Sequence, residues 1–360
     1  MEKFSLKTTI ISGSGAIAAL GEMHCGRVFL VADPYFSKNG TARKVAEAAK
    51  ATSWEVFDEI SPDPGVELAA RGTSRLREFR PDTLIALGGG SAMDCAKAMA
   101  YFSKLSCRLV AIPTTSGSGS EVTDFAILTH DQVKHPLIDG RLQPDVAILD
   151  SELLQALPKG LIADGGFDVL SHAVESFCAT ESNAFSDLYA REAFRCAYAA
   201  LPASYAGRQD VRLKIHQAAT MAGIAFSQAG LGLCHALSHA LGGTFHIPHG
   251  RLNAILLPTV ITMNSGVAGR KYAELARCAG IGGSAETIAV RNLKNGLIRL
   301  RQELDLPQTL SQAGLPPREL WNRMEHIVQA ALEDPCCRTN PVKPDDFLIR
   351  RLLEEVSGRG

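Results

Sequence analysis

The chain has 360 residues, of which 46% are apolar and 21% charged, and its formal net charge is −1. This length exceeds one ordinary hydrophobic core and predicts two domains. The near-zero charge offers no electrostatic attraction to nucleic acid or to an anionic membrane, and no apolar run approaches the length of a membrane span, so we expect neither partner. Nine Cys without CxxC spacing, and an N-terminus without a long apolar stretch, favour a reduced cytoplasmic location.

The first 150 residues alternate between strand-like and helix-like segments. The strand-like segments are short and rich in Val, Ile and Leu, as buried parallel strands are. They cover residues 27–33, 55–60, 82–89, 108–115 and 146–150. The helix-like segments between them cover residues 44–51, 67–79 and 92–102. This alternation predicts a doubly wound α/β domain, to which we assign residues 1–157.

From about Ser151 the pattern changes. Strand-like runs become rare, and long segments rich in Ala and Leu dominate, such as residues 186–201 and 213–226. These segments predict an all-α second domain over residues 158–360, with the junction in the LPKG segment.

Two polar loops follow strand-like segments of the first domain. Glycines 88–90 come directly after one of them, and Ser91 opens a helix; glycines let a backbone approach a diphosphate, and the helix N-terminus offers free N–H groups. A second loop, residues 114–120, adds hydroxyl groups after the next strand. Ser91 and Asp94 also have the spacing of a capping box, so a tight capped turn is the alternative. The GxGxxG fingerprint of the ordinary Rossmann family is not present.

Asp33 ends the strand-like segment 27–33. An acidic side chain there can bind the ribose hydroxyls of NAD and repel the 2′-phosphate of NADP. The alternative is a turn formed by Asp33 with Pro34.

Two pairs of polar residues four apart stand in helix-like segments of the second domain. Asp168 and His172 lie in GGFDVLSHAVESF, and His235 and His239 lie in GLCHALSHALGG. Residues four apart share a helical face, and His249 follows nearby in FHIPHG, so a carboxylate and several imidazoles could converge. That set suits Fe²⁺ or Zn²⁺, whereas a lone His on an apolar helix is usually a core residue. The spacing alone does not decide between His239 and His249 as a ligand.

Together these segments resemble the iron-containing (group III) alcohol dehydrogenase family. The resemblance runs from Phe4 to the C-terminus and is carried by GGGSAMDCAKAMA, AIPTTSGSGSEVTDFAILT, QPDVAILD, GGFDVLSHAVESF, FSQAGLGLCHALSHALGGTFHIPHGRLNAILLPTV and DPCCRTNPVKP. It implies an α/β dinucleotide-binding domain followed by an all-α metal-binding domain, the dehydroquinate synthase-like architecture. Within the family, the short N-terminus, SPDPGVE and FSQAGLGLCHALSHALGGTFHIPHG are most similar to enzymes of bacterial propanediol-utilisation microcompartments, with those of ethanolamine utilisation next.

The resemblance implies roles for individual residues. The implied metal ligands are Asp168, His172, His235 and His249, and His239 is implied as a catalytic residue beside the substrate and the nicotinamide. The implied cofactor contacts are Asp33, Asp63, Gly89, Gly90, Ser91, Asp94, Thr114, Thr115, Ser118 and Lys134. Asp63 stands where the family commonly has Asn. Phe125 and Phe226 are implied to line the substrate pocket.

The implied reaction is hydride transfer between NAD(H) and a short-chain aldehyde or alcohol, first of all propanal and 1-propanol, with Fe²⁺ or alternatively Zn²⁺ as Lewis acid. A homodimer is expected, with microcompartment shell or cargo proteins as further partners. The alternatives are an ethanolamine-utilisation ethanol dehydrogenase, a zinc-dependent glycerol-type dehydrogenase or a sugar-phosphate cyclase on the same scaffold, and a metal-bearing subunit of a protein shell. A cyclase needs Lys and Arg near the metal, and residues 235–250 contain none. A shell subunit has no need of phosphate loops.

Overall fold

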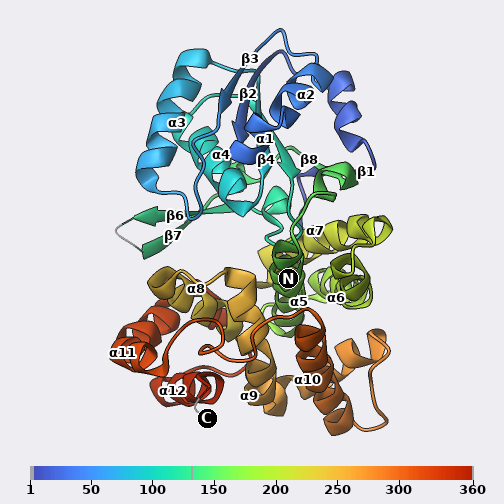
Figure 1. Cartoon of the computed structure of the whole chain (residues 1–360), viewed down its shortest axis with the longest axis vertical. Coiled ribbons are helices and arrows are strands. Elements are labelled where there is room, and N and C mark those ends of the chain that lie inside the picture. Colours follow the sequence, from blue (N-terminus) through green and yellow to red (C-terminus); the bar gives the residue numbers. More distant parts are fainter. Residues whose placement is uncertain (1–3, 131–132, 359–360) are drawn as a thin grey trace. The chain divides into compact units, whose positions relative to one another are not determined.

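The computed structural model describes residues 4–130 and 133–358, with the backbone alone described at 133 and 134. Contacts divide the chain into two units, Ser5–Leu157 and the chain from Pro158 on, which also includes Phe4. The first unit is α/β and the second is helical (Figure 1). The predicted fold class is therefore confirmed.

The first unit is built on a six-stranded parallel sheet with the order β1-β8-β5-β4-β2-β3. Its strands are β1 (Thr9–Gly13), β2 (Arg27–Ala32), β3 (Ser53–Phe57), β4 (Thr83–Gly88), β5 (Arg108–Pro113) and β8 (Val146–Asp150). The helices between them are α1 (Pro34–Lys38), α2 (Thr41–Ala48), α3 (Val66–Phe79) and α4 (Gly90–Ser103). A separate antiparallel hairpin consists of β6 (Phe125–His130) and β7 (Val133–Ile138).

The central strands are buried on both faces. On β2, Phe29 and Val31 belong to one apolar cluster together with residues of α3 and α4, whereas Val28 and Leu30 belong to another with residues of α2. Successive side chains of a strand point to opposite faces, so a strand covered on both sides has to be apolar at every position. This is why the central strands are visible in the sequence as unbroken apolar runs.

The edge strands differ from the prediction. The strand predicted at 55–60 is β3 at Ser53–Phe57, and β1 and the β6–β7 hairpin were not predicted. β1 lies at the edge of the sheet, and three of its five residues, Thr9, Ile10 and Ser12, are exposed. An edge strand with exposed residues carries no unbroken apolar run, so its sequence lacks the pattern that reveals the central strands.

The second unit consists of helices and the connections between them. They are α5 (Lys159–Cys178), α6 (Ala184–Tyr205), α7 (Arg212–Ala229), α8 (Leu233–Phe245), α9 (His249–Cys278), α10 (Glu286–Glu303), α11 (Pro317–Glu333) and α12 (Asp346–Val356). α5 packs against α6, α7 and α9, while α8 packs against α9 and α11. α5 and α9 thus form the centre of the unit.

Contrary to the expectation from the sequence, α9 is long and apolar enough to cross a membrane by length and composition. However, 67% of its 18-residue apolar stretch is buried in the structure, as expected of a helix in the core of a protein. Pro258 interrupts its hydrogen bonding, because proline has no N–H to donate to the Ala254 carbonyl. Arg301 of α10 donates to that carbonyl at 2.9 Å instead, and to the Ile255 carbonyl at 3.2 Å.

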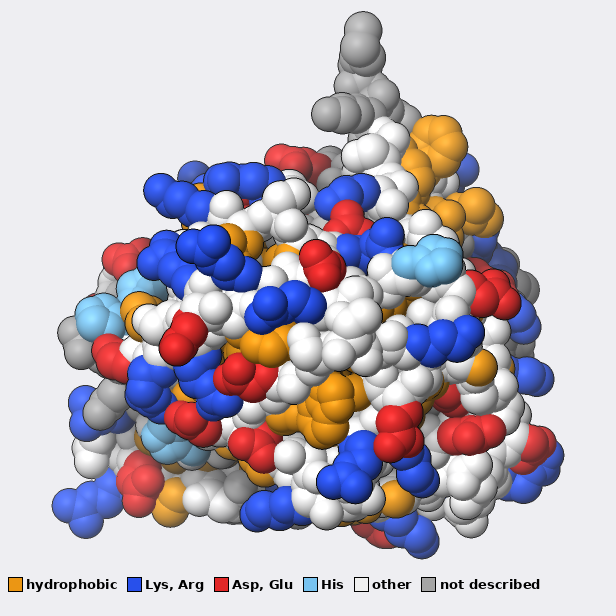
Figure 2. All heavy atoms as spheres, turned by 90° about the horizontal axis from the view of Figure 1, so that it is seen from above, with side chains coloured by type: hydrophobic (Ala, Val, Ile, Leu, Met, Phe, Trp, Pro, Cys, Tyr) orange, Lys and Arg blue, Asp and Glu red, His pale blue; other side chains and the backbone are white. Residues whose placement is uncertain are grey.

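The surface carries both signs of charge. On the face shown in Figure 2, Lys and Arg side chains are interspersed with Asp and Glu side chains, in keeping with 37 basic and 38 acidic residues. Mixed charges of this kind produce a weak long-range field.

Candidate active site

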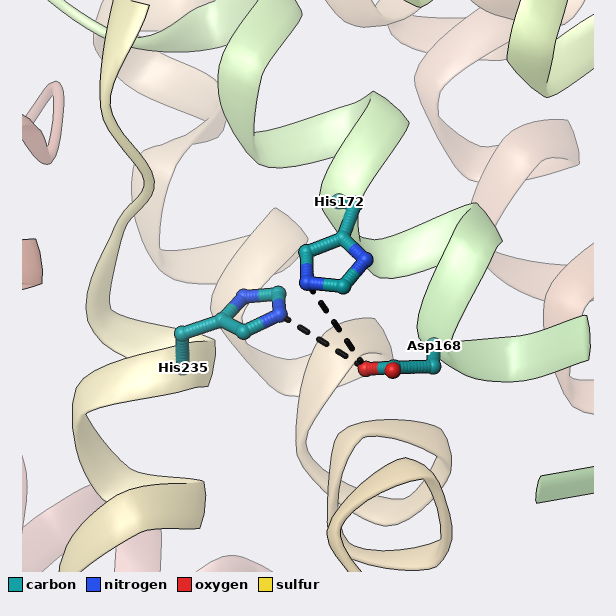
Figure 3. Close-up of side chains that lie close together, drawn as sticks. All are labelled: Asp168, His172 and His235. Carbon is teal, nitrogen blue, oxygen red and sulfur yellow. Dashed lines mark ion pairs between the residues drawn. The ribbon is translucent and has the colours of Figure 1, made fainter. Parts of the chain in front are cut away.

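Four side chains from three helices converge in the helical unit. Asp168 and His172 lie one turn apart on α5, and His235 lies at the start of α8 (Figure 3). The Oδ1 atom of Asp168 is 3.9 Å from His172 Nε2 and 3.8 Å from His235 Nε2. α9 begins at His249, whose Nε2 is 3.5 Å from the same oxygen. Asp168, His172 and His235 therefore offer ligand atoms within 4.8 Å of one another, and His249, the fourth predicted ligand, approaches Asp168.

These distances fit a bound divalent ion. Ligand atoms about 2.1 Å from a tetrahedral ion are about 3.4 Å apart. The three distances from Asp168 Oδ1 to the imidazole nitrogens, 3.5 to 3.9 Å, need only a small contraction to reach that value. Three imidazoles and one carboxylate suit Fe²⁺ or Zn²⁺.

Burial and charge set the protonation of the ligands. Burial opposes ionisation of Asp168, but the imidazoles of His172, His235 and His249 hold its pKa well below the usual range. Burial also lowers the pKa of His249 well below its usual range. For His235, burial lowers the pKa, but the neighbouring carboxylates of Asp168 and Glu175 outweigh burial and raise the pKa to about 9. A metal ion bound at His235 Nε2 would compete with a proton for that nitrogen, so metal affinity should fall with falling pH.

Two further side chains hold the ligands in place and were not predicted. Asn253 donates from Nδ2 to Asp168 Oδ1 at 2.9 Å, and its Oδ1 accepts from Ser238 at 2.5 Å. Glu175 accepts from His235 Nδ1 at 2.7 Å. Asn253 follows His249 by four residues and Glu175 follows His172 by three, so helical spacing could have identified both residues.

His239 lies in a separate group of polar side chains. The His239 Nδ1 atom lies 2.8 Å from Asp334 Oδ2, and His239, Asp334 and Cys336 form one group of possible metal-binding side chains. Asp168, His172 and His235 form the other group. Burial opposes ionisation of Asp334, but the hydrogen bond from His239 lowers its pKa to about 2. The His239 ring also stacks on His249 with centroids 5.1 Å apart. The role of His239 as a catalytic residue stays a prediction.

The two predicted pocket residues lie in different units. Phe226 of α7 stacks on the His172 ring with centroids 4.4 Å apart, next to the ligands. Phe125 begins β6, and its carbonyl accepts from the buried Lys97 at 2.9 Å. Their role in lining a substrate pocket stays a prediction.

The predicted cofactor residues follow adjacent strands of the α/β unit. The Asp33 N–H donates to the Leu87 carbonyl, and the Thr114 N–H donates to the Gly88 carbonyl, both at 3.0 Å. The ends of β2, β4 and β5 therefore lie side by side. β3 lies on the far side of β2, so the strand order reverses between β2 and β4. In open α/β sheets, ligands bind at such a switch point.

The two predicted phosphate loops pack against each other. A Cβ on Gly89 would lie 3.2 Å from Thr115 Oγ1, and one on Gly90 would lie 3.3 Å from Ser118 Cβ. Gly89 is the N-cap of α4 and offers no capping side chain, while Ser91 lies in the first turn. The N-terminus of α4 thus has the features of an anion-binding site.

Asp94 is not part of a capping box that begins at Ser91, the alternative that its spacing offered, because the N-cap of α4 is Gly89. Its carboxylate instead accepts from Ser120 Oγ at 2.8 Å and from the Ile127 N–H at 3.2 Å. Lys97 donates to the same Ser120 hydroxyl at 2.9 Å. A longer-range contact has replaced the local one, and Asp94 ties α4 to the second loop.

The remaining predicted cofactor residues occupy turns. Asp33 accepts from the Tyr35 N–H at 2.9 Å as the N-cap of α1, so the turn-forming alternative is present in the structure. Asp63 has a φ of 52°, in the left-handed region that Asn and Asp adopt most readily among non-glycine residues. The side chain of Lys134 lies outside the described residues.

Comparison with known proteins matches both halves of the chain. Residues 7–151 match the model of the iron-containing alcohol dehydrogenases, and residues 162–356 match the C-terminal model of the Fe-containing alcohol dehydrogenase family. A 1-propanol dehydrogenase, PduQ of Salmonella typhimurium, is 39% identical over 99% of this chain and 100% of its own. An iron-containing alcohol dehydrogenase from Thermococcus thioreducens has a TM-score of 0.92 and 32% identity over 98% of this chain and 99% of its own. A sulfoacetaldehyde reductase from Bifidobacterium kashiwanohense, solved with NAD⁺, has a TM-score of 0.89 and 25% identity over the whole of both chains.

Proposed function

Because the chain belongs to the iron-containing alcohol dehydrogenase family and is an alcohol dehydrogenase, we propose that it interconverts propanal and 1-propanol with NADH and NAD⁺. The observation that carries this proposal is the convergence of Asp168, His172, His235 and His249 on one point. The likeness to PduQ supports propanal as the substrate. The absence of Lys and Arg from residues 235–250 disfavours a phosphorylated substrate.

We assign the chemistry to residues as follows. Asp168, His172, His235 and His249 would hold Fe²⁺, or Zn²⁺ in its place. When bound, this ion supplies a Lewis acid that stabilises the negative charge developing on the substrate oxygen. His239 delivers or accepts the proton at Nε2, while Asp334 fixes its ring through Nδ1. Phe226 provides an apolar surface beside His172 for a short alkyl chain.

The α/β unit is assigned to the cofactor. Residues 1–157 would bind NAD(H) at the switch point between β2 and β4, and residues 158–360 would bind the metal and the substrate. The diphosphate is placed at Gly89, Gly90 and Ser91, with Thr114, Thr115 and Ser118 alongside. Asp33 is placed at the ribose. The further proposed cofactor contacts are Asp63, Asp94 and Lys134.

We place the enzyme in a bacterial microcompartment as a homodimer, where the reduction of propanal would regenerate NAD⁺. This proposal rests on the likeness to the PduQ relatives. Shell or cargo proteins would be its partners. Cofractionation of the chromosomally expressed enzyme with purified compartments tests this location, and an enzyme found only in the remaining cytoplasm contradicts it.

Steady-state kinetics test the reaction. Protein purified without oxygen and loaded with Fe²⁺ should oxidise NADH with ethanal, propanal and butanal, with the highest kcat/KM for propanal. One methylene in an apolar pocket changes kcat/KM by about 10- to 200-fold. His235→Ala should lose both the metal and the rate. An enzyme that prefers butanal, or that uses only NADPH, would contradict the proposed substrate or cofactor.

A further inference from the structure

The first turn of α8 is held by a carboxylate from another helix. Glu175 of α5 is 6% exposed, and its Oε2 accepts the N–H groups of Gly232 and His235 at 3.0 and 3.2 Å. Its Oε1 accepts the Cys234 N–H at 2.7 Å. The Leu233 N–H donates to Asn340 at 3.1 Å. All four N–H groups that a helix N-terminus leaves without an intrahelical partner are therefore satisfied by these two side chains.

The Glu175 carboxylate also holds the imidazole ring of His235. Glu175 Oε2 accepts a hydrogen bond from His235 Nδ1 at 2.7 Å. A carboxylate only accepts, so Nδ1 carries the hydrogen, and the lone pair that can bind a metal lies on Nε2. That nitrogen faces Asp168 Oδ1 at 3.8 Å. Glu175 thus sets both the tautomer and the direction of one candidate ligand.

Local geometry explains how one side chain does both. Asp168, His172 and Glu175 stand at i, i+4 and i+7 on α5, which places them on one helical face. Gly232 lets the carboxylate approach, because a Cβ there would lie 2.7 Å from Glu175 Oε1 and 2.8 Å from Asn340 Oδ1. α5 would therefore supply two ligands and position a third.

We propose that Glu175 is a positioning residue that couples metal affinity to the folding of the first turn of α8. The proposal rests on the metal-binding part of the proposed function. It follows that a bound ion stabilises this turn, because the ring it binds and the backbone N–H groups share one acceptor. It follows as well that loss of the carboxylate weakens metal binding by more than it weakens the fold.

Glutamine is the sharpest substitution at this position. It keeps the size of glutamate but replaces one oxygen with an NH₂ group, which only donates. If the NH₂ group takes the place of Oε1, it faces the Cys234 N–H, and two donors then meet without an acceptor. Placed at Oε2, it opposes two backbone N–H groups and forces His235 Nδ1 to become an acceptor, which puts the hydrogen on Nε2. Either arrangement disturbs the turn or the ligand.

The matched control is Asn340→Ala. Asn340 caps the same turn through the Leu233 N–H, but the His235 ring bonds to Glu175 and not to Asn340. If Glu175 acted only as a cap, the two substitutions would lower metal affinity in proportion to their loss of stability. If Glu175 positions the ring, only Glu175→Gln lowers affinity beyond that proportion.

Metal titration of the full-length proteins tests the proposal. Zn²⁺ affinity is measured by competition with a chelating dye, the visible spectrum of bound Co²⁺ reports the ligand geometry, and thermal unfolding reports stability. We expect Glu175→Gln to weaken Zn²⁺ binding about 10- to 100-fold and to alter the Co²⁺ spectrum. We expect Asn340→Ala to lower the unfolding temperature and to keep the wild-type Co²⁺ spectrum. Equal affinity in Glu175→Gln and wild type, or parallel losses in both variants, would overturn the proposal.

Two further measurements separate the remaining outcomes. If Glu175→Gln does not fold, Glu175→Asp takes its place; its carboxylate is one methylene shorter and should weaken Zn²⁺ binding with an altered Co²⁺ spectrum, and an unchanged affinity would overturn the proposal. In wild type, Zn²⁺ should slow amide hydrogen exchange at residues 233–236, and unchanged exchange contradicts the coupling. A wild-type protein that binds neither Zn²⁺ nor Co²⁺ would refute the proposed metal site itself.

Discussion

Substitution of Gly250 by Ala should remove the metal and leave most of the fold. α9 begins at His249, and Gly250 is the next residue. A Cβ on Gly250 would lie 1.9 Å from the carbonyl oxygen of Asp164 and 2.6 Å from its carbonyl carbon. Both atoms are backbone atoms of α5, so no rotamer change relieves the clash.

The displacement can be worked out from these distances. Ordinary contact for a Cβ starts at 3.4 Å, so α9 has to withdraw from α5 by about 1.5 Å. Asp164 and Asp168 share α5, so this movement takes His249 away from Asp168. The separation of 3.5 Å between His249 Nε2 and Asp168 Oδ1 would grow to about 5 Å. Two bonds of about 2.1 Å span at most about 4.2 Å, so one ion no longer reaches both atoms.

Elemental analysis after dialysis and thermal unfolding check this prediction. Gly250→Ala should lose on the order of 100-fold or more in metal affinity, because even partners outside the ligand set contribute 10- to 100-fold. Overpacking should cost about 1–3 kcal/mol of unfolding free energy. Gly266→Ala on the same helix is the control: its Cβ meets nothing within 4 Å, so it should keep the metal and gain up to about 1 kcal/mol. Wild-type metal affinity in Gly250→Ala would refute the reasoning.

Three further predictions concern other parts of the chain. His239→Ala should keep the metal but lose rate in a pH-dependent way, whereas His249→Ala should lose the metal; elemental analysis of both variants decides, and the reverse pattern would exchange their roles. Asp33→Asn should raise kcat/KM with NADPH relative to NADH, because it keeps the cap of α1 but removes the charge that repels a 2′-phosphate; an unchanged ratio means that Asp33 acts only as a cap. Burial raises the pKa of Cys95 to about 12, so the folded thiol keeps its proton at a pH where the unfolded thiol, with a pKa of about 8.5, has lost it. The contribution of Cys95 to the free energy of unfolding is therefore complete below about pH 8.5 and falls by about 2 kcal/mol by pH 10. Unfolding by denaturant at several pH values should show a smaller alkaline decline in stability for Cys95→Ala than for wild type, and an equal decline would contradict this assignment.

The sequence predicted the parts of the fold in which pattern and burial coincide. The strands β2, β4, β5 and β8 are central and covered, so their apolar runs stand out. β1 and the β6–β7 hairpin are partly exposed, and nothing in their short sequences requires a strand. Asp94 shows the same limit at the level of one residue. Its spacing from Ser91 fits a local cap, and only tertiary packing brings Ser120 and Ile127 to it.

The candidate ligands were visible because their spacing is local, and the residues that hold them were missed where their contacts are distant. Asp168 and His172 are one turn apart, but Glu175 meets α8 and Asn340 meets Leu233 across 57 to 107 positions of the chain. Such contacts depend on which helices pack together, and one sequence does not state this. Asp334 lies 95 positions from His239, and no spacing rule links the two.

One face of α5 nevertheless indicates more than the two candidate ligands on it. Asp164, Asp168, His172 and Glu175 follow one another at steps of four, four and three residues in a helix that is otherwise largely apolar. A buried polar side chain is costly unless it is paired, so four of them on one face require partners on the neighbouring helices. Asp164 is paired with Arg251, Asp168 with Asn253 and Glu175 with the first turn of α8, while His172 faces Asp168 Oδ1 at 3.9 Å and stacks on the Phe226 ring. A polar stripe at helical spacing within an apolar helix therefore predicts the candidate ligands together with side chains that hold them, provided that all four positions are considered and not only the two that could bind a metal.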